Sequence, residues 1–257
     1  MRALLSAKPD ERALRIAEKV KRALERENIS VCPLGECSPC AVDFIVVVGG
    51  DGTLLYTLSK ASCKTPPVIT VRAGRRAFLL DLEPEEFEWG LKRFLEGDYY
   101  KETHKRLDVE GIYALNEVAV LSKWRRVTRV NVVADEYKVY EGLEGDGVIV
   151  STTIGSTAYA LSAGGPLVDP RAEVLLLVPV NPIQLNARSI VLPPTSKVRV
   201  EVTRNREETI VLADGIVELE KKDLTITLNG PEVTFARFKI REFYSKLIEL
   251  RSFFSKD

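Results

Sequence analysis

The feature that most constrains the fold is a Val-rich, predominantly apolar run at residues 42–48 that ends in a glycine turn. Such a run is typical of a parallel strand that is buried on both faces of its sheet. Gly49-Gly50-Asp51-Gly52-Thr53 follows directly, and residues 53–61 have the pattern of a helix. A buried strand that turns through glycines into a helix predicts an α/β layer.

The rest of the first hundred residues extends this layer. A short strand is expected at 2–6, and apolar residues recur at helical spacing over 10–27. A second buried strand at 68–71 precedes a helix at 84–95. Alternating strands and helices predict a doubly wound, Rossmann-like α/β domain over residues 1–98.

The pattern changes near Gly97, where short strands with β-branched or alternating character begin. Strands are expected at 112–121, 127–134, 148–151, 174–178, 198–203, 209–212 and 224–228, with a short helix at 156–162. This spacing predicts an all-β, sandwich-like second domain over residues 99–239. Residues 241–254 return to helical spacing, and we expect a C-terminal helix within 240–257 to pack back on the first domain and complete it.

The composition excludes several classes of protein. Lys+Arg and Asp+Glu balance at 37 each, so net charge gives no reason to expect nucleic acid or an anionic membrane as partner. The N-terminus turns polar too soon for a signal peptide, and no apolar run is long enough to span a membrane, which predicts a cytoplasmic protein. The chain has one Gln, one His and one Met among many charged residues, a pattern associated with thermophiles.

Four cysteines lie at positions 32, 37, 40 and 63. The first three have a C-x4-C-x2-C spacing that is compatible with a metal or cluster site, but Glu36 is the only other ligand type nearby. Free thiols or a disulfide are the favoured alternatives. A hyperthermophile can keep disulfides even in the cytosol. Cys32 with Cys37 or Cys40 is the pairing to test.

The glycine turn has the features of a phosphate site. Glycines let the backbone approach a ligand closely, and consecutive N–H groups at the start of a helix attract phosphate. These properties favour Gly49, Gly50 and Thr53 as phosphate contacts. Asp51 would repel a phosphate, so two interpretations stay open: a general base facing an acceptor hydroxyl, or a cap of the following helix.

A second glycine-rich segment occupies residues 145–166 and includes Gly155-Ser156-Thr157-Ala158-Tyr159. Small and hydroxyl residues suit close approach to a ligand, and Tyr159 is available to pack on a flat ring. A crowded strand-to-helix corner would also explain its glycines, although it explains the polar residues less well.

Together these segments resemble the NAD kinase family. The family's hallmarks are a GGDGT turn, an Asn-Glu pair and a stretch with G-S-T-A-Y and S-A-G-G-P, which correspond here to 49–53, Asn116-Glu117 and 155–166. Lipid kinases and phosphofructokinases are similar at the GGDGT turn, whereas the other two elements are more specific. Without the resemblance, Asn116-Glu117 would be interpreted as a polar turn on a strand. If the pair is buried, however, its side chains need hydrogen-bond partners.

The resemblance implies transfer of a phosphoryl group from ATP, or from another phosphate donor such as polyphosphate, to the 2′-hydroxyl of the adenosine ribose of NAD, with Asp51 as catalytic base. It implies Mg²⁺, because the metal neutralises charge on the transferred group, and a homodimer or homotetramer. No residue is assigned as a metal ligand. The implied acceptor contacts are Gly52, Phe78, Asn116, Glu117, Asp146, Thr157, Ala158, Tyr159 and Ser162.

Several positions depart from the family pattern. Where the family has Asn and Leu-Gly after the second strand, this chain has Arg72 and Arg76-Ala77, and Arg75 lies directly before Arg76. The three arginines suit an anionic ligand, so all are expected at the donor phosphates; a solvated basic loop is the alternative. Ile154 replaces a hydroxyl residue that would reach the adenine, and Ile216 replaces a frequent Gln.

Three hypotheses for function therefore stay open. The leading one is an NAD kinase. The second is a related kinase that phosphorylates a different nucleotide or a polyol. The third is a nucleotide-binding regulator without turnover, although a protein that only binds nucleotide has no need of the base Asp51.

Overall fold

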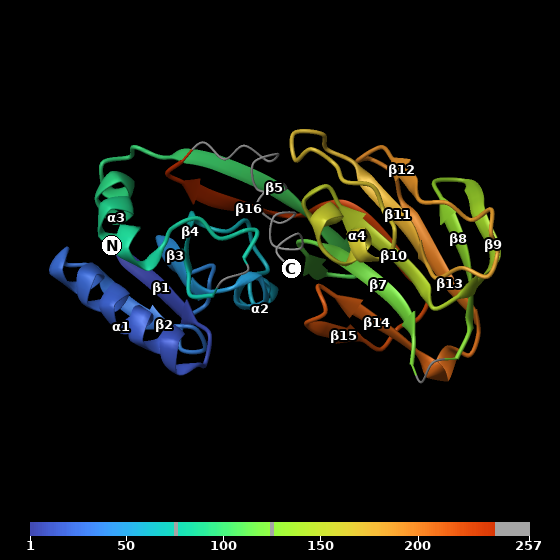
Figure 1. Cartoon of the computed structure of the whole chain (residues 1–257), viewed down its shortest axis with the longest axis horizontal. Coiled ribbons are helices and arrows are strands. Elements are labelled where there is room, and N and C mark those ends of the chain that lie inside the picture. The colour runs from blue at the N-terminus through green and yellow to red at the C-terminus, as the bar shows by residue number, and fades with distance from the viewer. Residues whose placement is uncertain (75–76, 124–125, 240–257) are drawn as a thin grey trace, which may run out of the picture. The chain divides into compact units, whose positions relative to one another are not determined.

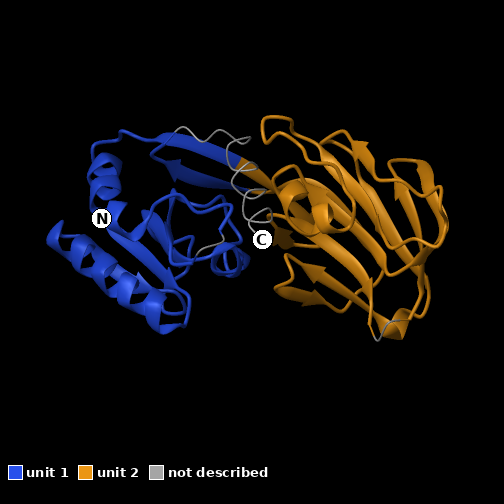
Figure 2. Cartoon of the chain, viewed as in Figure 1, with its two compact units in different colours: residues 1–103, 232–257 blue, residues 104–231 orange. Residues whose placement is uncertain are grey.

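The computed structural model describes residues 1–74, 77–123 and 126–239 (Figure 1). The chain divides into two compact units (Figure 2). Unit 1 holds residues 1–103 and the described residues 232–239, and unit 2 holds residues 104–231. The strand expected at 224–228 is the longer β16 (Leu224–Arg237), which begins in unit 2 and continues into unit 1.

Unit 1 contains the predicted parallel sheet. Its strands pair in the order β2-β1-β3-β4, with the bounds β1 (Arg2–Ala7), β2 (Ser30–Pro33), β3 (Phe44–Gly49) and β4 (Val68–Arg72). All these pairings are parallel, and the end of β16 adds a further parallel bridge to β4 between Phe235 and Val68. Every residue of β3 is buried, as its Val-rich sequence predicts.

Three helices accompany this sheet: α1 (Glu11–Arg26), α2 (Asp51–Ser59) and α3 (Phe87–Leu95), the last preceded by the 3₁₀ turn η1 (Pro84–Glu86). The Asp10 side chain caps α1 by accepting a hydrogen bond from the Ala13 N–H at 2.8 Å. The buried face of α1, which includes Val20 and Leu24, joins one core with β3 and α3. The α/β class predicted for this domain is confirmed.

Unit 2 contains an antiparallel sheet with the order β12-β11-β10-β7-β14-β15. Its strands are β7 (Glu117–Ser122), β10 (Gly147–Thr152), β11 (Leu175–Val180), β12 (Ile190–Leu192), β14 (Thr209–Ala213) and β15 (Val217–Leu219). Opposite it lie β8 (Thr128–Ala134), β9 (Tyr137–Gly145), β13 (Val198–Arg204), the first part of β16, and the paired strands β5 (Tyr100–Val109) and β6 (Ile112–Ala114).

The core of unit 2 lies between these two sets of strands. Val118 and Val150 from the six-stranded sheet share one apolar cluster with Val132 and Val200 from the opposite strands. The sandwich-like architecture predicted from the strand spacing is therefore confirmed. The other face of the six-stranded sheet packs on Ala160 of α4 (Tyr159–Ser162), and the 3₁₀ helix η2 (Ile154–Thr157) precedes α4. A further 3₁₀ turn, η3 (Arg206–Glu208), lies between β13 and β14.

The predicted C-terminal helix and its packing fall on residues 240–257, which lie outside the described part of the chain. Among the described residues, no helix has both the length and the apolar character needed to cross a membrane.

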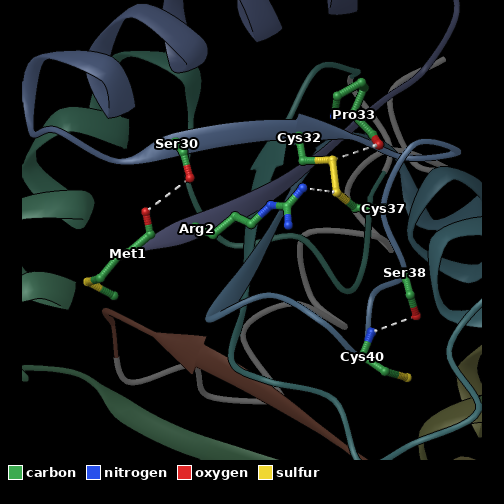
Figure 3. Close-up of a disulfide and its surroundings, with 8 residues drawn as sticks. All are labelled: Met1, Arg2, Ser30, Cys32, Pro33, Cys37, Ser38 and Cys40. Atoms are coloured by element: carbon green, nitrogen blue, oxygen red, sulfur yellow. Dashed lines mark hydrogen bonds between the residues drawn. A yellow bond between two sulfur atoms is a disulfide. The ribbon is translucent and has the colours of Figure 1, made fainter.

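The four cysteines form two disulfides, both in unit 1. Cys32 bonds to Cys37, and Cys40 bonds to Cys63. Figure 3 shows the first of these, with the Arg2 guanidinium donating a hydrogen bond to the Cys37 sulfur at 2.7 Å. The disulfide alternative is thus the correct one, and Cys40 pairs with Cys63, for which no partner was predicted.

The Cys40–Cys63 disulfide is expected to be the more stabilising of the two. It spans 23 residues of sequence, against five for Cys32–Cys37, and a longer closed loop restricts the unfolded chain more. Replacing both Cys40 and Cys63 with Ser should lower the free energy of unfolding by about 3 kcal/mol, and replacing Cys32 and Cys37 by about 2 kcal/mol. Denaturant unfolding of the oxidised proteins checks this order, and a larger loss for the Cys32–Cys37 variant would contradict it.

Candidate active site

The glycine turn joins β3 to α2 in unit 1. A Cβ added to Gly49 would lie 2.3 Å from the Thr53 Oγ1, so no other residue fits there without a shift. Gly50 is the N-cap of α2, and its N–H donates to the Thr53 hydroxyl at 3.5 Å. The helix therefore begins at Asp51, two residues earlier than predicted, and presents its free N–H groups at the turn.

Asp51 does not cap its own helix. Its carboxylate accepts hydrogen bonds from the backbone N–H groups of Phe78, at 2.8 Å, and Leu79, at 2.9 Å. Each carboxylate oxygen accepts one of these bonds and keeps capacity for another donor. The capping interpretation is wrong, and the bonds fix the direction in which the Asp51 side chain points.

The other predicted groups of unit 1 are Gly52 in α2 and the arginines at and after the end of β4. Gly52 faces open space, since an added Cβ would meet no atom within 4 Å. Arg72 is the last residue of β4, and its Nη1 lies 3.3 Å from the Glu83 carboxylate, so its charge is partly neutralised. Arg75 and Arg76 lie outside the described residues.

In unit 2, Glu117 is the first residue of β7 and Asn116 directly precedes it, and each is only 7% exposed. The Asp214 carboxylate holds this segment by accepting hydrogen bonds from the N–H groups of Leu115 at 2.7 Å, Asn116 at 2.7 Å and Glu117 at 3.1 Å. Asp214 has a φ of 53°, a left-handed conformation that Asp tolerates better than most residues. This role of Asp214 was not predicted from the sequence, because its partners lie 97 to 99 positions away.

The glycine-rich segment at 145–166 packs directly on the pair. The Ser151 hydroxyl donates to the Asn116 carbonyl at 3.0 Å, and the Thr152 hydroxyl donates to the Leu115 carbonyl at 2.7 Å. A Cβ added to Gly155 would lie 2.2 Å from the same Asn116 carbonyl oxygen. Glycine at 155 is thus required by this close approach, and the backbone of Asn116 is held on two sides.

Each side chain of the pair has one buried oxygen without a partner, although the Glu117 carboxyl also accepts a hydrogen bond from the Tyr159 backbone N–H. Asn116 Oδ1 and Glu117 Oε2 are buried, and no hydrogen bond to either is found in the described part of the chain. Buried polar atoms without a partner are costly, because they lose their hydrogen bonds to water. Two such atoms on adjacent residues indicate that a ligand supplies the missing hydrogen bonds.

The remaining predicted residues of unit 2 differ in exposure. Thr157 and Ala158 are half-buried, whereas Tyr159 and Ser162 are exposed. Asp146 is exposed, and its carboxylate accepts a hydrogen bond from the Asn181 side chain at 2.7 Å. Of the two departures from the family pattern in this unit, Ile154 is buried and Ile216 is partly exposed.

Burial also changes the ionisation of the pair's carboxyl group. It raises the pKa of Glu117 from 4.5 to about 8, and the neighbouring Asp214 carboxylate adds to the rise. Burial likewise raises the pKa of Asp214 from 3.8 to about 6, although its three backbone hydrogen bonds and Arg106 lower it. At neutral pH the folded protein therefore holds a proton on Glu117 that the unfolded chain has lost.

This difference predicts how stability depends on pH. Because the folded state binds more protons between the unfolded and folded pKa values, the free energy of unfolding falls as the pH rises from 4.5 to about 8. Glu117→Gln cannot ionise and should lose most of that slope, while Glu207→Gln, at an exposed glutamate, should keep it. Denaturant unfolding across this pH range is the measurement, and equal slopes in all three proteins would contradict the raised pKa.

Comparison with known proteins extends over most of the chain. Residues 35–99 match the ATP-NAD kinase N-terminal domain, and residues 115–229 match the ATP-NAD kinase C-terminal domain. An NAD kinase of Aeropyrum pernix is 41% identical over 216 residues, which cover 80% of this chain and 77% of that protein. An NAD kinase of Thermococcus sibiricus is 37% identical over 221 residues, which cover 83% of this chain and 79% of that protein.

Solved structures agree with these relatives. The crystal structure of an NAD kinase from Archaeoglobus fulgidus in complex with ATP superposes with a TM-score of 0.85 at 32% identity, covering 98% of this chain and 99% of that one. Yeast NADH kinase complexed with NADH superposes with a TM-score of 0.88, covering 100% and 89%. Its 20% identity means that this second likeness shows the fold alone.

Proposed function

The chain belongs to the NAD kinase family and phosphorylates NAD, and we propose that Asp51 is its catalytic base and that Asn116 and Glu117 hold the acceptor nucleotide. The observation that carries this proposal is the pair of buried, unpartnered atoms, Asn116 Oδ1 and Glu117 Oε2. A protonated Glu117 donates a hydrogen bond and Asn116 Oδ1 accepts one, so together they match a ligand that has both kinds of group.

In the proposed reaction the 2′-oxygen of the adenosine ribose attacks the γ-phosphorus of ATP. The bond from that phosphorus to the oxygen bridging it to ADP breaks, and ADP leaves with the electron pair. The proton of the 2′-hydroxyl passes to the Asp51 carboxylate. The hydrogen bonds from Phe78 and Leu79 hold that carboxylate in position to receive it, which is the requirement for general base catalysis.

The donor phosphates are proposed to lie at the glycine turn, where Gly49, Gly50 and Thr53 begin α2. The first N–H groups of α2 have no carbonyl one turn earlier in the helix to bond and carry partial positive charge, both of which attract phosphate, whereas the Thr53 N–H already donates to the Gly50 carbonyl at 3.0 Å. Arg72 is a further candidate there, although its pairing with Glu83 reduces the charge it offers.

Mg²⁺ is proposed to enter with the triphosphate. Within the described residues no group of three or more His, Cys, Asp or Glu side chains is placed to hold a metal ion. Mg²⁺ commonly binds through substrate phosphates and water with few protein ligands, and this arrangement fits the residues present. Bound in this way, the ion would neutralise charge on the transferred phosphoryl group.

The other acceptor contacts stay proposals on the strength of the family motif. They are Gly52, Phe78, Asp146, Thr157, Ala158, Tyr159 and Ser162. The homodimeric or homotetrameric assembly, the cytoplasmic location and the thermophilic origin likewise stay predictions from the sequence.

An acceptor panel tests the proposed function. The purified protein would be incubated with Mg²⁺ and ATP plus one acceptor at a time: NAD, NADH, adenosine, AMP or a polyol, with ADP formation as the readout. We expect a dinucleotide to give the highest kcat/KM. A mononucleotide or polyol preferred over NAD would instead favour the related-kinase alternative, for which the buried Ile154 is the motivating observation.

A further inference from the structure

The two N–H groups that hold the Asp51 carboxylate belong to a loop. Phe78 and Leu79, which donate them, lie in the connection between β4 and η1, within neither a helix nor a strand. Loops are more mobile than helices and strands, because fewer of their backbone groups bond to a neighbouring element. The direction in which Asp51 points therefore depends on the contacts that fix this loop.

The far end of the loop is fixed by β4. The Leu82 N–H donates to the Thr70 carbonyl at 3.0 Å, and the Leu82 carbonyl accepts from the Arg72 N–H at 2.8 Å. The Asp81 N–H donates to the Thr70 hydroxyl at 2.9 Å. These bonds hold residues 81 and 82, but none of them is made by the two residues that bind Asp51.

Arg237 provides an anchor for Leu79. It is the last residue of β16, is only 4% exposed, and donates from Nη1 to the Leu79 carbonyl at 2.8 Å. The N–H of the same residue, Leu79, donates to Asp51 at 2.9 Å. Leu79 is thus bonded through its carbonyl to a buried arginine and through its N–H to the Asp51 carboxylate. Directly after Arg237, the Phe238 N–H donates to the Asp81 carboxylate at 3.1 Å, so the end of β16 holds the loop at two points.

The guanidinium of Arg237 is itself fixed by two further contacts. Its Nε and Nη2 donate to the two carboxylate oxygens of Glu102, at 2.7 and 3.3 Å. Glu102 lies on β5, which pairs with β16 (Figure 1). The guanidinium carbon lies 4.3 Å from the centre of the Phe235 ring. Because a guanidinium is planar and rigid, a carboxylate bound at two of its nitrogens sets the direction of the third, which here donates to Leu79.

Stability alone does not explain a buried arginine at this position. Removing a guanidinium from water is costly, and the attraction to its carboxylate partner often only balances that cost. Apolar side chains of similar volume in place of a buried ion pair are often as stable or more so. The contact that such side chains could not make is the one to the Leu79 carbonyl, and this contact gives a functional reason for arginine at 237.

We propose that Arg237 is a positioning residue for phosphoryl transfer, which fixes Leu79 and through it the Asp51 carboxylate. All three residues lie in unit 1. The inference rests on the proposed function, because it requires Asp51 to be the base. Proton transfer needs the base within hydrogen-bond reach of the acceptor hydroxyl, and a displacement of about 1 Å in a reacting group can lower the rate about 100-fold.

Arg237→Lys tests this role, since lysine keeps the charge and the alkyl stem but loses the planar fork. We expect kcat to fall at least about tenfold, while KM for ATP and KM for NAD stay within about twofold of wild type. Arg206→Lys is the matched control and should keep wild-type kinetics. Arg206 also donates to one carbonyl, that of Val202 at 2.7 Å, and to both carboxylate oxygens of Asp223, at 2.9 and 2.8 Å.

A double-mutant cycle with Asp51→Asn separates positioning from a general loss of structure. If Arg237 acts through Asp51, adding Arg237→Lys to Asp51→Asn should change kcat by no more than about twofold. A further tenfold fall in that background would overturn the proposal, and so would a folded Arg237→Lys single variant with a kcat within about twofold of wild type. Failure of the proposed function is distinct, because Asp51→Asn alone would then keep its kcat.

A second variant keeps the test decisive if Arg237→Lys does not fold. Arg237→Met combined with Glu102→Gln leaves no unpaired charge at this position, and such replacements of buried ion pairs are often tolerated. Kinetics would be measured below the unfolding midpoint of each protein. We expect this double variant to show the same fall in kcat with KM values near wild type, and a wild-type kcat in it would refute the role of Arg237.

Discussion

Asp51→Asn is expected to lower kcat by at least about 100-fold, because the amide cannot accept the proton of the acceptor hydroxyl. The loss should be confined to kcat. Asn keeps a side-chain oxygen for one of the two N–H donors at Phe78 and Leu79, so the loop after β4 stays near its place. The measurement is initial rates of NADP formation at saturating ATP and NAD, together with calorimetric binding of both nucleotides.

Asp98→Asn is the matched control for this variant. Asp98 is an exposed aspartate of the same unit whose carboxylate accepts from Arg93 at 2.7 Å. Exposed ion pairs contribute little to stability, and this one is distant in sequence from the turn, so wild-type kinetics are expected. If Asp51→Asn retained more than about a tenth of the wild-type kcat, Asp51 would not be the base.

Asp214→Ala is expected to give the largest loss of stability. The substitution removes the acceptor of three buried N–H groups, and it leaves Arg106, which is buried, without the nearby charge. Each orphaned buried group costs about 1–3 kcal/mol, so the total loss should reach at least about 3 kcal/mol. For a chain of this size that corresponds to a fall in the unfolding midpoint of about 10 °C.

The same variant should also weaken acceptor binding, because Asp214 positions the backbone that carries Asn116 and Glu117. A rise in KM for NAD with a smaller change in kcat is expected at temperatures where the variant is folded. Asp108→Ala is the control: its carboxylate accepts from the Gly111 N–H in a surface turn, and its loss should cost no more than about 1.5 kcal/mol. Equal losses of unfolding free energy in the two variants would contradict the proposed role of Asp214 in holding the backbone of Asn116 and Glu117.

The sequence predicts the elements of this fold well where burial is uniform along a segment. Every residue of β3 is buried, so its apolar run has no competing interpretation. By contrast β5 was not predicted, because charged residues on its exposed positions conceal the alternation over its first half. The extent of β16 was also missed, since Asn229-Gly230-Pro231 has the composition of a turn although the strand continues through it.

The site shows the same division between local and distant information. The glycine turn can be recognised in the sequence because its residues are adjacent. Gly49 is required because a Cβ there would clash with the side chain of Thr53, only four positions away. The groups that orient the functional side chains are not adjacent. Asp51 bonds to residues 27 and 28 positions away, and Asp214 bonds to residues 97 to 99 positions away. No local pattern encodes such pairs, so only the folded chain reveals them.

Product analysis of a single reaction tests the central claim most directly. Wild-type protein, Mg²⁺, ATP and NAD would be incubated together, and the products separated, with the new phosphate located by ³¹P NMR and confirmed by an NADP-specific dehydrogenase. We predict one ADP for each NADP, with the phosphate on the 2′-oxygen of the adenosine ribose. ADP formed without NADP, or a phosphate at another position, would contradict the account.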